Sequence, residues 1–465
     1  MRIDVLPDDV LLGIFDFYIN AFSPYTRDKS EIEAWQSLVH VCRRWRSIVF
    51  GSPRRLNLRL CCTPETPAKD RLDVWPALPL FIIFKGSPVS GTDNIIAALG
   101  QRNRVRQVIL GGRQLGEVLA TMQVPFPELV EMHLWSKYKS SSASPVIPDS
   151  FLGGSAPRLQ KLRLSSLSFP GLPTLLLSAI HLVDLYLDGI PHSGYISPEA
   201  MVTTLSAMPN LKMLHLEFQS RQSRPDWESQ SLPPPEHAIL PALYKFHFRG
   251  VAEYLEELVT GIDTPQLTHM EIFFFDQSDF DCSRLTQFIN RTPDFSSFDE
   301  ARVVFCDSGV SVILRHRTSS YGFDDLLIDI ICSDADRQLP FVERVLNPSL
   351  HFISTVEVLY IEDEHHQNWK SEVIENTLRL ELLLPFTALK NFFLCDEFAP
   401  GIADDLQELV GARLTEVLPS LQNIFIDWLE PPRSFQENIR GFIAARQLSD
   451  HPISTSYWNR YTNGR

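Results

Sequence analysis

The sequence predicts an α/β fold in which a small unit of three helices precedes a solenoid with a curved parallel sheet and outer helices. Three observations support this prediction: helical spacing of apolar residues near the start, a short phrase that recurs along most of the chain, and amphipathic segments between its copies. We expect the helical unit to cover residues 1–56 and the solenoid to cover residues 57–430. Residues 431–465 are expected to form a C-terminal capping segment or a tail.

Apolar residues with helical spacing dominate residues 5–50. Between residues 6 and 18 they recur every three or four positions, and Pro7 suits a first helical turn. A second stripe carries Trp35, Cys42 and Trp45 and is expected to bend near Arg43. Three short helices bury little apolar surface by themselves, so we expect this unit to pack against something else.

An eight-residue phrase, Pro-x-Leu-x-x-φ-x-φ with φ apolar, recurs along the chain at intervals of roughly 23 to 33 residues. We expect the proline to open each strand and inward-pointing φ residues such as Leu134, Leu164 and Leu216 to be buried. The interval and the helical segments between copies are typical of leucine-rich repeats, whose strands follow one another in a parallel sheet. Full copies begin at residues 127, 157, 209, 241, 265 and 419; variants cover 180–187, 354–361 and 387–394, and weaker ones 104–110, 299–305 and 324–330.

The outward positions of these strands carry side chains that dominate protein interfaces, which predicts a surface that binds a protein substrate. An ordinary solvated or helix-covered sheet face is an equal alternative. Toward the C-terminus the outward residues become aromatic, at Tyr360, Phe393 and Phe425. The polar segments 136–150 and 219–237 are either a rim of this surface or disordered insertions. The residues expected to bind substrate are His133, Trp135, Arg163, Tyr186, His215 and His247.

We expect no metal, cofactor or catalytic site. The histidines come from different repeats with no close ligand pair, which disfavours a metal site. The segment 361–367 (IEDEHHQ) is expected to be a solvated loop, and the acidic pairs Asp324–Asp325 and Asp404–Asp405 are expected at helix starts. Because the sequence lacks G-x-S-x-G, H-E-x-x-H and Walker motifs, we expect a protein that is not an enzyme.

The composition indicates which classes of partner and which cellular compartment to expect. A net charge of −15 disfavours binding to nucleic acid. Seven cysteines without a C-x-x-C pair indicate a reducing compartment. The sequence contains no signal-peptide pattern and no run near the roughly 20 apolar residues of a membrane span. We therefore expect a cytoplasmic and/or nuclear protein with neither nucleic-acid nor membrane partners.

Residues 5–56 contain Leu6–Pro7 followed by Ile14–Phe15, and later Val41–Cys42 followed by Trp45–Arg46 and Pro53, and in these motifs they resemble the F-box family. Two separated motifs agree with the family in order and spacing, although the segment 20–33 is longer than the usual loop and residues 54–56 lack a frequent tryptophan. The whole arrangement resembles the F-box proteins with divergent leucine-rich repeats that are abundant in mushroom-forming fungi.

The resemblance implies a non-catalytic subunit of a Skp–cullin–F-box ubiquitin ligase. Its F-box would bind the Skp-type adaptor protein, and through it cullin, while the repeats would capture an unknown protein substrate. Two alternatives stay open: a scaffold or binding protein that acts outside a ligase, and an enzyme hidden in the repeats. The residues expected to contact the adaptor or support that contact are Leu6, Pro7, Val10, Leu11, Ile14, Phe15, Leu38, Val41, Cys42, Trp45 and Arg46.

Overall fold

The computed structural model divides the chain into two compact units, Met1–Ile196 and Ser197–Arg465, and each is described by itself. The boundaries predicted at residues 56 and 430 follow the sequence pattern rather than contacts, and they stay predictions. The structure describes residues 6–21, 34–65, 68, 72, 77–85, 91–112, 115–136, 145–221, 237–276, 282–317, 325–332, 335–346, 350–363, 382–395, 399–409, 413–427 and 433–458.

The first unit begins with three short helices, α1 (Asp8–Ala21), α2 (Ala34–Val41) and α3 (Arg43–Gly51). The bend predicted near Arg43 is confirmed, because Cys42 is extended between α2 and α3 (φ −158°, ψ 170°). Leu11, Phe15 and Trp35 are at most 2% exposed and form the centre of this segment. The indole Nε1 of Trp35 donates to the carbonyl of Arg59 at 2.9 Å, which ties α2 to the chain that leads into the sheet.

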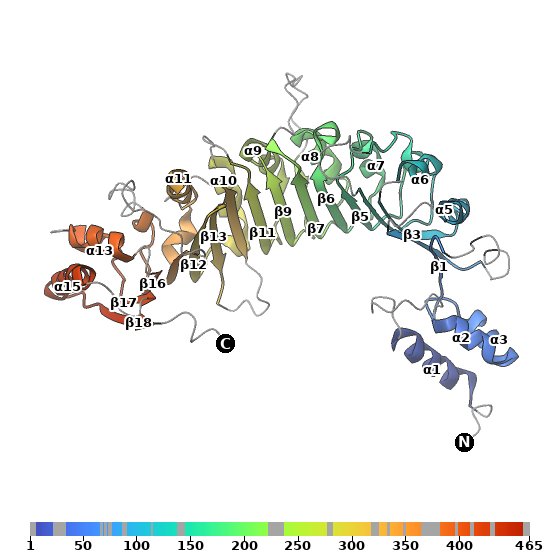
Figure 1. Ribbon diagram of the computed structural model, residues 1–465, viewed down its shortest axis with the longest axis horizontal. Coiled ribbons are helices and arrows are strands. Elements are labelled where there is room, and N and C mark those ends of the chain that lie inside the picture. The colour runs from blue at the N-terminus through green and yellow to red at the C-terminus, as the bar shows by residue number, and fades with distance from the viewer. Residues whose placement is uncertain are drawn as a thin grey trace. The chain divides into compact units, whose positions relative to one another are not determined.

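Six parallel strands follow in the first unit, in the order β1-β2-β3-β4-β5-β6. Helices lie between them in the chain, as the repeat predicted, and Figure 1 shows them along one side of the strands. The elements are β1 (Leu60–Cys62), β2 (Leu80–Lys85), α5 (Thr92–Leu99), β3 (Val105–Gly111), α6 (Leu115–Thr121), β4 (Glu131–Trp135), η2 (Phe151–Gly154), β5 (Lys161–Ser165), α7 (Leu172–Ser178), β6 (Asp184–Ile190) and η3 (His192–Gly194).

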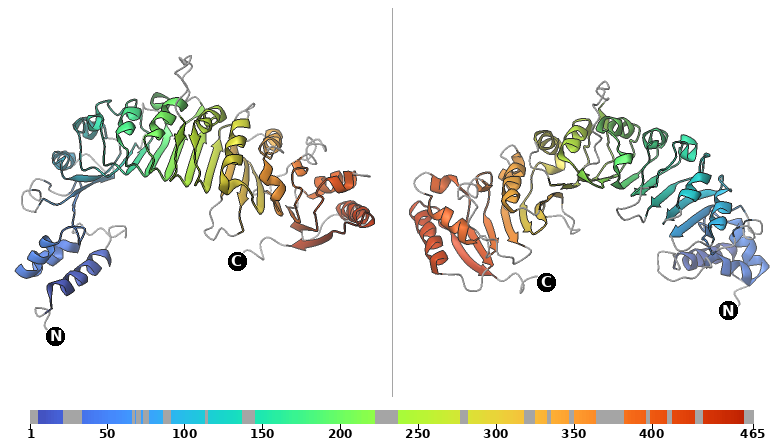
Figure 2. Two further views of the ribbon diagram at one scale, coloured as in Figure 1. Left: turned by 180° about the vertical axis from the view of Figure 1, so that it is seen from behind. Right: turned by 45° about the horizontal axis from the view of Figure 1, so that its top comes forward.

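The second unit starts with α8 (Pro198–Ser206) and carries ten neighbouring strands in the order β7-β9-β11-β14-β13-β12-β15-β16-β17-β18. Figure 2 shows its helices along one side of the strands. A small parallel pair, β8 (Ala238–Ile239) and β10 (Ile262–Asp263), lies outside this sheet. The remaining strands are β7 (Met213–Phe218), β9 (Lys245–Gly250), β11 (His269–Phe274), β12 (Glu300–Cys306), β13 (Gly309–Arg315), β14 (Leu326–Ile331), β15 (Val358–Asp363), β16 (Asn391–Cys395), β17 (Asn423–Asp427) and β18 (Ser454–Trp458).

The helical elements of the second unit connect these strands. Residues 431–465 were predicted as a cap or a tail. In the structure, α15 (Arg433–Leu448) contacts α13 (Ala399–Gln407), and β18 adds a parallel strand beside β17. The elements after α8 are α9 (Ala252–Thr260), α10 (Ser283–Arg291), η5 (Pro293–Phe295), α11 (Ala335–Val345), η6 (His351–Thr355), α13 (Ala399–Gln407), α14 (Arg413–Glu416) and α15 (Arg433–Leu448).

All twelve copies of the recurring phrase contribute strands, and the inward leucines are buried as predicted: Leu134, Leu164 and Leu216 are at most 4% exposed. The proline, however, does not open the strand. Pro127 lies in a turn four residues before β4, and the amide of Leu129 donates to the carbonyl of Phe126 at 3.1 Å. Proline therefore occupies the second position of a β-turn, where its fixed φ is favourable.

The prediction of successive parallel strands is wrong in one region of the second unit. β12, β13 and β14 form an antiparallel meander, and it is inserted in reverse order, with β14 beside β11 and β12 beside β15. The two-residue turn at Asp307–Ser308 explains the reversal, because such a short loop joins only antiparallel strands. A strand at 309–315 was not predicted, although Asp-Ser-Gly beside alternating apolar residues is a hairpin signal.

Candidate functional site

Helix α1 exposes one apolar face. Val10 is 43% exposed, Ile14 47% and Phe17 78%, and their spacing of four and three residues places them on the same side of the helix. Phe17 was not predicted as a site residue, although its position three residues after Ile14 was a usable signal. Single exposed apolar side chains are ordinary, whereas a group of this kind marks an interaction surface. We call Val10, Ile14 and Phe17 the α1 apolar face.

The structure separates the eleven residues predicted for adaptor binding into two groups. Leu11, Phe15 and Leu38 are at most 7% exposed, so of the two predicted roles, contact and support, only support of the contact surface fits them. Their helical positions turn them toward the neighbouring helices rather than outward. The side chains that are available are the exposed Pro7, Val10, Ile14, Val41, Cys42 and Arg46 and the half-buried Leu6 and Trp45.

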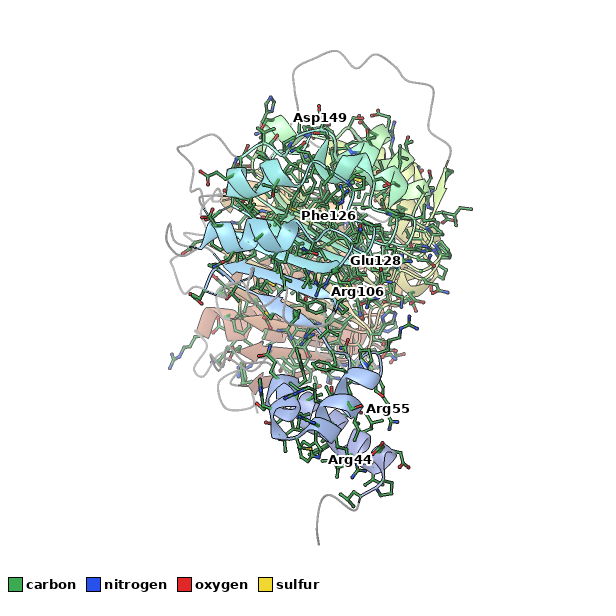
Figure 3. The ribbon with its side chains drawn as sticks, turned by 90° about the vertical axis from the view of Figure 1, so that its right-hand side faces the viewer. Arg44, Arg55, Arg106, Phe126, Glu128 and Asp149 are labelled. Carbon is green, nitrogen blue, oxygen red and sulfur yellow. The ribbon has the colours of Figure 1, made fainter. Side chains whose placement is uncertain are left out.

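Polar contacts hold the three helices in place around this face. Arg44, labelled in Figure 3, forms an ion pair with Asp8 at 2.6 Å and donates to the carbonyl of Leu6 at 2.5 Å. The Sγ of Cys42 accepts a hydrogen bond from the amide of Trp45 at 3.5 Å and so caps α3. The ring of Trp45 lies 4.8 Å from that of Phe15. At least one of the arginines in this basic helix thus has a structural role.

Four predicted substrate-binding residues lie together on the sheet of the first unit. His133, Arg163 and Tyr186 occupy one register row across β4, β5 and β6, and Trp135 follows His133 by two residues on the same face. The guanidinium of Arg163 lies 5.6 Å from the ring centroid of Tyr186. Trp135 covers Gly111, where an added Cβ would lie 1.8 Å from the indole ring. This face therefore presents packed, partly exposed aromatic and cationic side chains.

The other two predicted residues, His215 and His247, lie on the sheet of the second unit. They are register partners on β7 and β9, and their rings are stacked with centroids 3.9 Å apart and planes within 4°. Glu217 carries an oxygen 3.6 Å from His215 Nε2. The reasoning that these histidines lack a close ligand partner is therefore wrong, because parallel pairing brings residues of different repeats to one strand spacing.

Two ionised carboxylates flank the histidine pair. Nδ1 of His247 lies 2.9 Å from Glu271, and Lys245 donates to the same carboxylate at 2.7 Å. The hydrogen bond from His247 is the main cause that lowers the pKa of Glu271 to about 2, and Lys245 adds to this effect. The pKa of Glu217 is also lowered, first by His215 and then by Arg249. The outward row is thus a connected network of charges.

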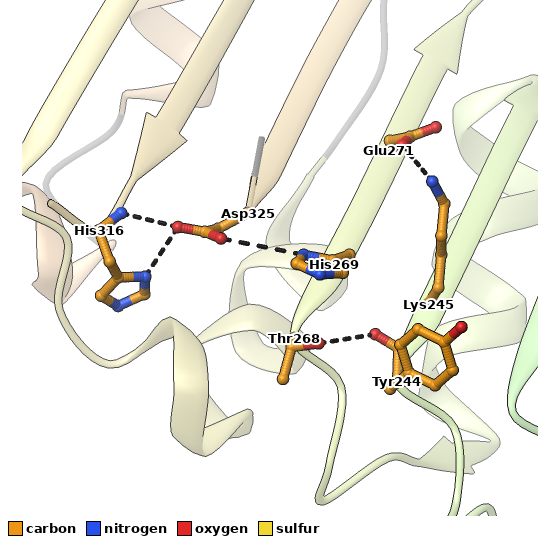
Figure 4. Close-up of polar contacts among 7 residues, drawn as sticks. All are labelled: Tyr244, Lys245, Thr268, His269, Glu271, His316 and Asp325. Carbon is orange, nitrogen blue, oxygen red and sulfur yellow. Dashed lines mark hydrogen bonds and ion pairs between the residues drawn. The ribbon is translucent and has the colours of Figure 1, made fainter. Parts of the chain in front are cut away.

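A second polar group lies at the start of β14. Asp325 is 5% exposed and accepts from the backbone amide of His316 at 2.7 Å, with Nδ1 of the same ring 2.9 Å away. His269 Nδ1 lies 3.8 Å from its other oxygen (Figure 4). The helix start predicted at Asp324–Asp325 is wrong, because Asp325 precedes a strand and anchors a loop instead. Asp324 lies outside the described residues.

An aromatic stack occupies the same outward row further along the second unit. Tyr360, Phe393 and Phe425 are register partners on β15, β16 and β17, with centroids 4.4 Å and 4.3 Å apart and planes within 17° and 10°. The guanidinium of Arg302 lies 4.8 Å from the ring centroid of Tyr360. Such stacking adds about 0.5–1.5 kcal/mol per pair beyond burial, so the stack is rigid as well as partly exposed.

Several sequence predictions differ from the structure or fall partly outside the described residues. The Asp404–Asp405 pair lies inside α13 rather than at its start, and Asp405 is buried. Residues 361–363 of the predicted loop 361–367 belong to β15, where Glu362 and Asp363 are buried. The other residues of that loop, and most of the two polar segments (137–144 and 222–236), lie outside the described residues. Among the helices that are described, none is long and apolar enough to cross a bilayer.

Comparison with known proteins gives no family assignment: no family model and no curated protein matches this chain. Among solved structures, the chain is similar to the leucine-rich repeat-containing protein LegL7 from Legionella pneumophila (12% identity over 83% of this chain and 97% of that one, TM-score 0.26). It is also similar to a chain of the TLR13–ssRNA13 complex (10% identity, 84% and 47% coverage, TM-score 0.30). The leucine-rich-repeat-like description follows from the recurring turns, strands and helices described above.

Proposed function

We propose that this chain is the substrate-recognition subunit of a Skp–cullin–F-box ubiquitin ligase, in which α1–α3 bind the Skp-type adaptor. The α1 apolar face carries this proposal. Its three side chains are exposed on a segment whose sequence resembles an F-box, and burying them against a partner would remove apolar surface from water. Pro7 and Val41 are also exposed and remain candidate contacts.

The repeats would then hold a protein substrate on the outward sheet face. Trp135, Arg163 and Tyr186 in the first unit are partly exposed side chains of the types that dominate interface hot spots. Each is fixed by its strand and by neighbouring side chains, so binding would cost little conformational entropy. The aromatic stack around Phe393 is the second candidate surface for the same role.

The adaptor proposal is tested by co-purification with a Skp-type adaptor and cullin. The variant Val10→Ser, Ile14→Ser, Phe17→Ser should lose the adaptor, because it removes the apolar contact without touching the core. Leu448→Ser is the matched control, since Leu448 is a 90% exposed apolar residue of α15, far along the chain. Equal adaptor capture by the triple variant and the control would defeat the proposal. Capture of the adaptor without cullin would instead favour a scaffold that acts outside a ligase.

The substrate surface is tested by affinity purification and mass spectrometry, with adaptor binding as the control. Arg163→Glu together with Tyr186→Ala should remove proteins that the unchanged chain captures, while the adaptor stays bound. If capture is unchanged, the same experiment with Phe393→Ala decides whether the aromatic stack binds the substrate. Unchanged capture in both variants would place the substrate elsewhere.

A further inference from the structure

We propose that His215, Glu217 and His247 form a binding site for a divalent transition metal, with Zn²⁺ as the preferred ion. One ligand atom of each of these three residues lies within 4.8 Å of the other two. Two imidazoles and one carboxylate are a donor set that suits Zn²⁺, Cu²⁺ or Ni²⁺ rather than Mg²⁺ or Ca²⁺, which prefer oxygen ligands.

The backbone brings the three donors together. His215 and His247 are register partners on neighbouring parallel strands, which are about 4.8 Å apart. Glu217 follows His215 by two residues, so its side chain stands on the same face of β7. The side chains of His215, Glu217 and His247 are only 15%, 20% and 14% exposed, so the site is shielded from most of the solvent. The three donors therefore form a triangle on rigid strands rather than on a loop.

The hydrogen bond to Glu271 prepares His247 for metal binding. Lys245 Nζ lies 2.7 Å from Glu271 and stabilises its ionised form, which can only accept hydrogen bonds. In the neutral ring, Nδ1 of His247, 2.9 Å from that carboxylate, therefore carries the proton, and the lone pair lies on Nε2. Nε2 is buried and has no hydrogen-bond partner among the described residues. A carboxylate behind the ring of a metal-bound histidine is a common arrangement that fixes tautomer and orientation.

Glu217 is held in a comparable way. Arg249 donates to its Oε1 at 2.7 Å, and its Oε2 faces His215 at 3.6 Å. One oxygen is thus oriented by the arginine and the other is directed at the site. The positive charge of Arg249 opposes a cation, so we expect weaker binding than at structural zinc sites with thiolate ligands.

Metal binding requires one local rearrangement. The two imidazole rings are parallel and stacked, whereas a metal bonds to imidazole nitrogen in the plane of the ring. Because the hydrogen bond to Glu271 holds His247, the ring of His215 must turn about its Cβ–Cγ bond until the two planes converge, which unstacks the rings. With three protein ligands, the metal keeps a position open for a carboxylate or imidazole of a bound partner.

The test is titration of the purified full chain with Zn²⁺ by calorimetry and with Co²⁺ by visible absorption. We expect one ion per chain, Co²⁺ bands of a low-symmetry nitrogen and oxygen site, and no thiolate charge-transfer band. His247→Gln should abolish this binding, and Glu271→Gln should weaken it by about 10- to 100-fold because it removes only the orienting carboxylate.

His316→Gln is the matched control, since His316 is also a partly exposed histidine beside a carboxylate in the second unit. It should bind Zn²⁺ like the unchanged chain. Far-ultraviolet circular dichroism of each variant checks that the fold is retained, and Glu217→Gln provides a second ligand variant if His247→Gln does not fold. Absence of binding, a thiolate band, or loss of binding in His316→Gln with retention in His247→Gln would each overturn the proposal.

Discussion

We predict that Arg446 makes a large and specific contribution to the stability of the C-terminal strands. This residue lies in α15 and is fully buried, and its guanidinium donates to three carbonyls, those of Leu414 at 2.9 Å, Leu418 at 3.2 Å and Pro419 at 3.4 Å. Leu418 has a left-handed backbone (φ 52°), so the arginine braces a strained turn that leads into β17. Burial lowers the pKa of Arg446, which reflects the cost of holding its charge away from water.

The expected magnitude follows from two opposing effects. Hydrogen bonds to a charged donor contribute about 1.5–3 kcal/mol each, whereas burying the charge costs several kcal/mol. Replacement by methionine keeps the apolar packing and removes the buried charge, but it leaves three carbonyls without their hydrogen-bond donor. We expect Arg446→Met to lower the free energy of unfolding by about 2–4 kcal/mol, a net loss within these limits. The free energy of unfolding of Arg446→Lys should lie between those of the unchanged chain and Arg446→Met, because an ammonium group cannot reach all three acceptors.

The assay is urea unfolding combined with hydrogen exchange at the amide of Ser454, which donates to the carbonyl of Gln422 and reports on the β17–β18 pairing. Repeat proteins can unfold in parts, so a local probe is needed beside the global one. Arg440→Met, an exposed arginine of the same helix, is the control and should change stability by less than about 0.5 kcal/mol. Equal protection of Ser454 in the two methionine variants would refute the reasoning.

Three further predictions concern the core and one half-buried acid, Asp329. Leu164→Ala should cost about 2–5 kcal/mol by forming a cavity, measured by thermal or urea unfolding, whereas Arg163→Ala on the exposed side should change little. Phe15→Ala should cost about 3–5 kcal/mol and Phe17→Ala almost nothing, since one is buried and the other 78% exposed; equal costs would contradict the orientation of α1. Burial raises the pKa of Asp329, so the unfolded chain loses this proton first as pH rises and stability falls above the usual aspartate pKa of about 3.9. Asp329→Asn should therefore gain stability relative to the unchanged chain as pH rises, and a gain independent of pH would contradict this assignment.

The sequence was sufficient to predict the structural elements that recur in each repeat. The turn, the buried leucine and the alternating strand recur with one spacing, so the strands at 131–135, 161–165 and 213–218 could be predicted from residue type alone. The meander of β12, β13 and β14 was only partly found with the same phrase: weak copies without the proline matched β12 and β14, and no copy matched β13, which follows β12 after a two-residue turn. The turn residues at 306–309 are a separate hairpin signal, and only that signal predicts the antiparallel strand.

Side-chain partnerships were harder to predict than strands. His215 and His247 are 32 positions apart in the sequence, and only the register of β7 with β9 makes them stacked neighbours. Arg446 gave no signal, because an arginine in a helical pattern is usually solvated. Conversely, Phe17 was predictable from helical spacing, since it continues the stripe of Val10 and Ile14.

The inward and outward rows of the second unit constrain the sequence in different ways. Inward register partners such as Leu214 and Phe246 are both at most 1% exposed, and each needs only to be apolar and of suitable volume. The outward partners His215, His247 and Glu271 are connected by ring stacking at 3.9 Å and a hydrogen bond at 2.9 Å, and this combination needs an aromatic ring that also carries a hydrogen-bonding nitrogen. Parallel pairing thus lets one outward residue per strand change the chemistry of the face while the core stays intact. Substitutions in the outward row are therefore expected to alter ligand binding far more than stability, which is the pattern that the metal titration and the substrate-capture variants measure.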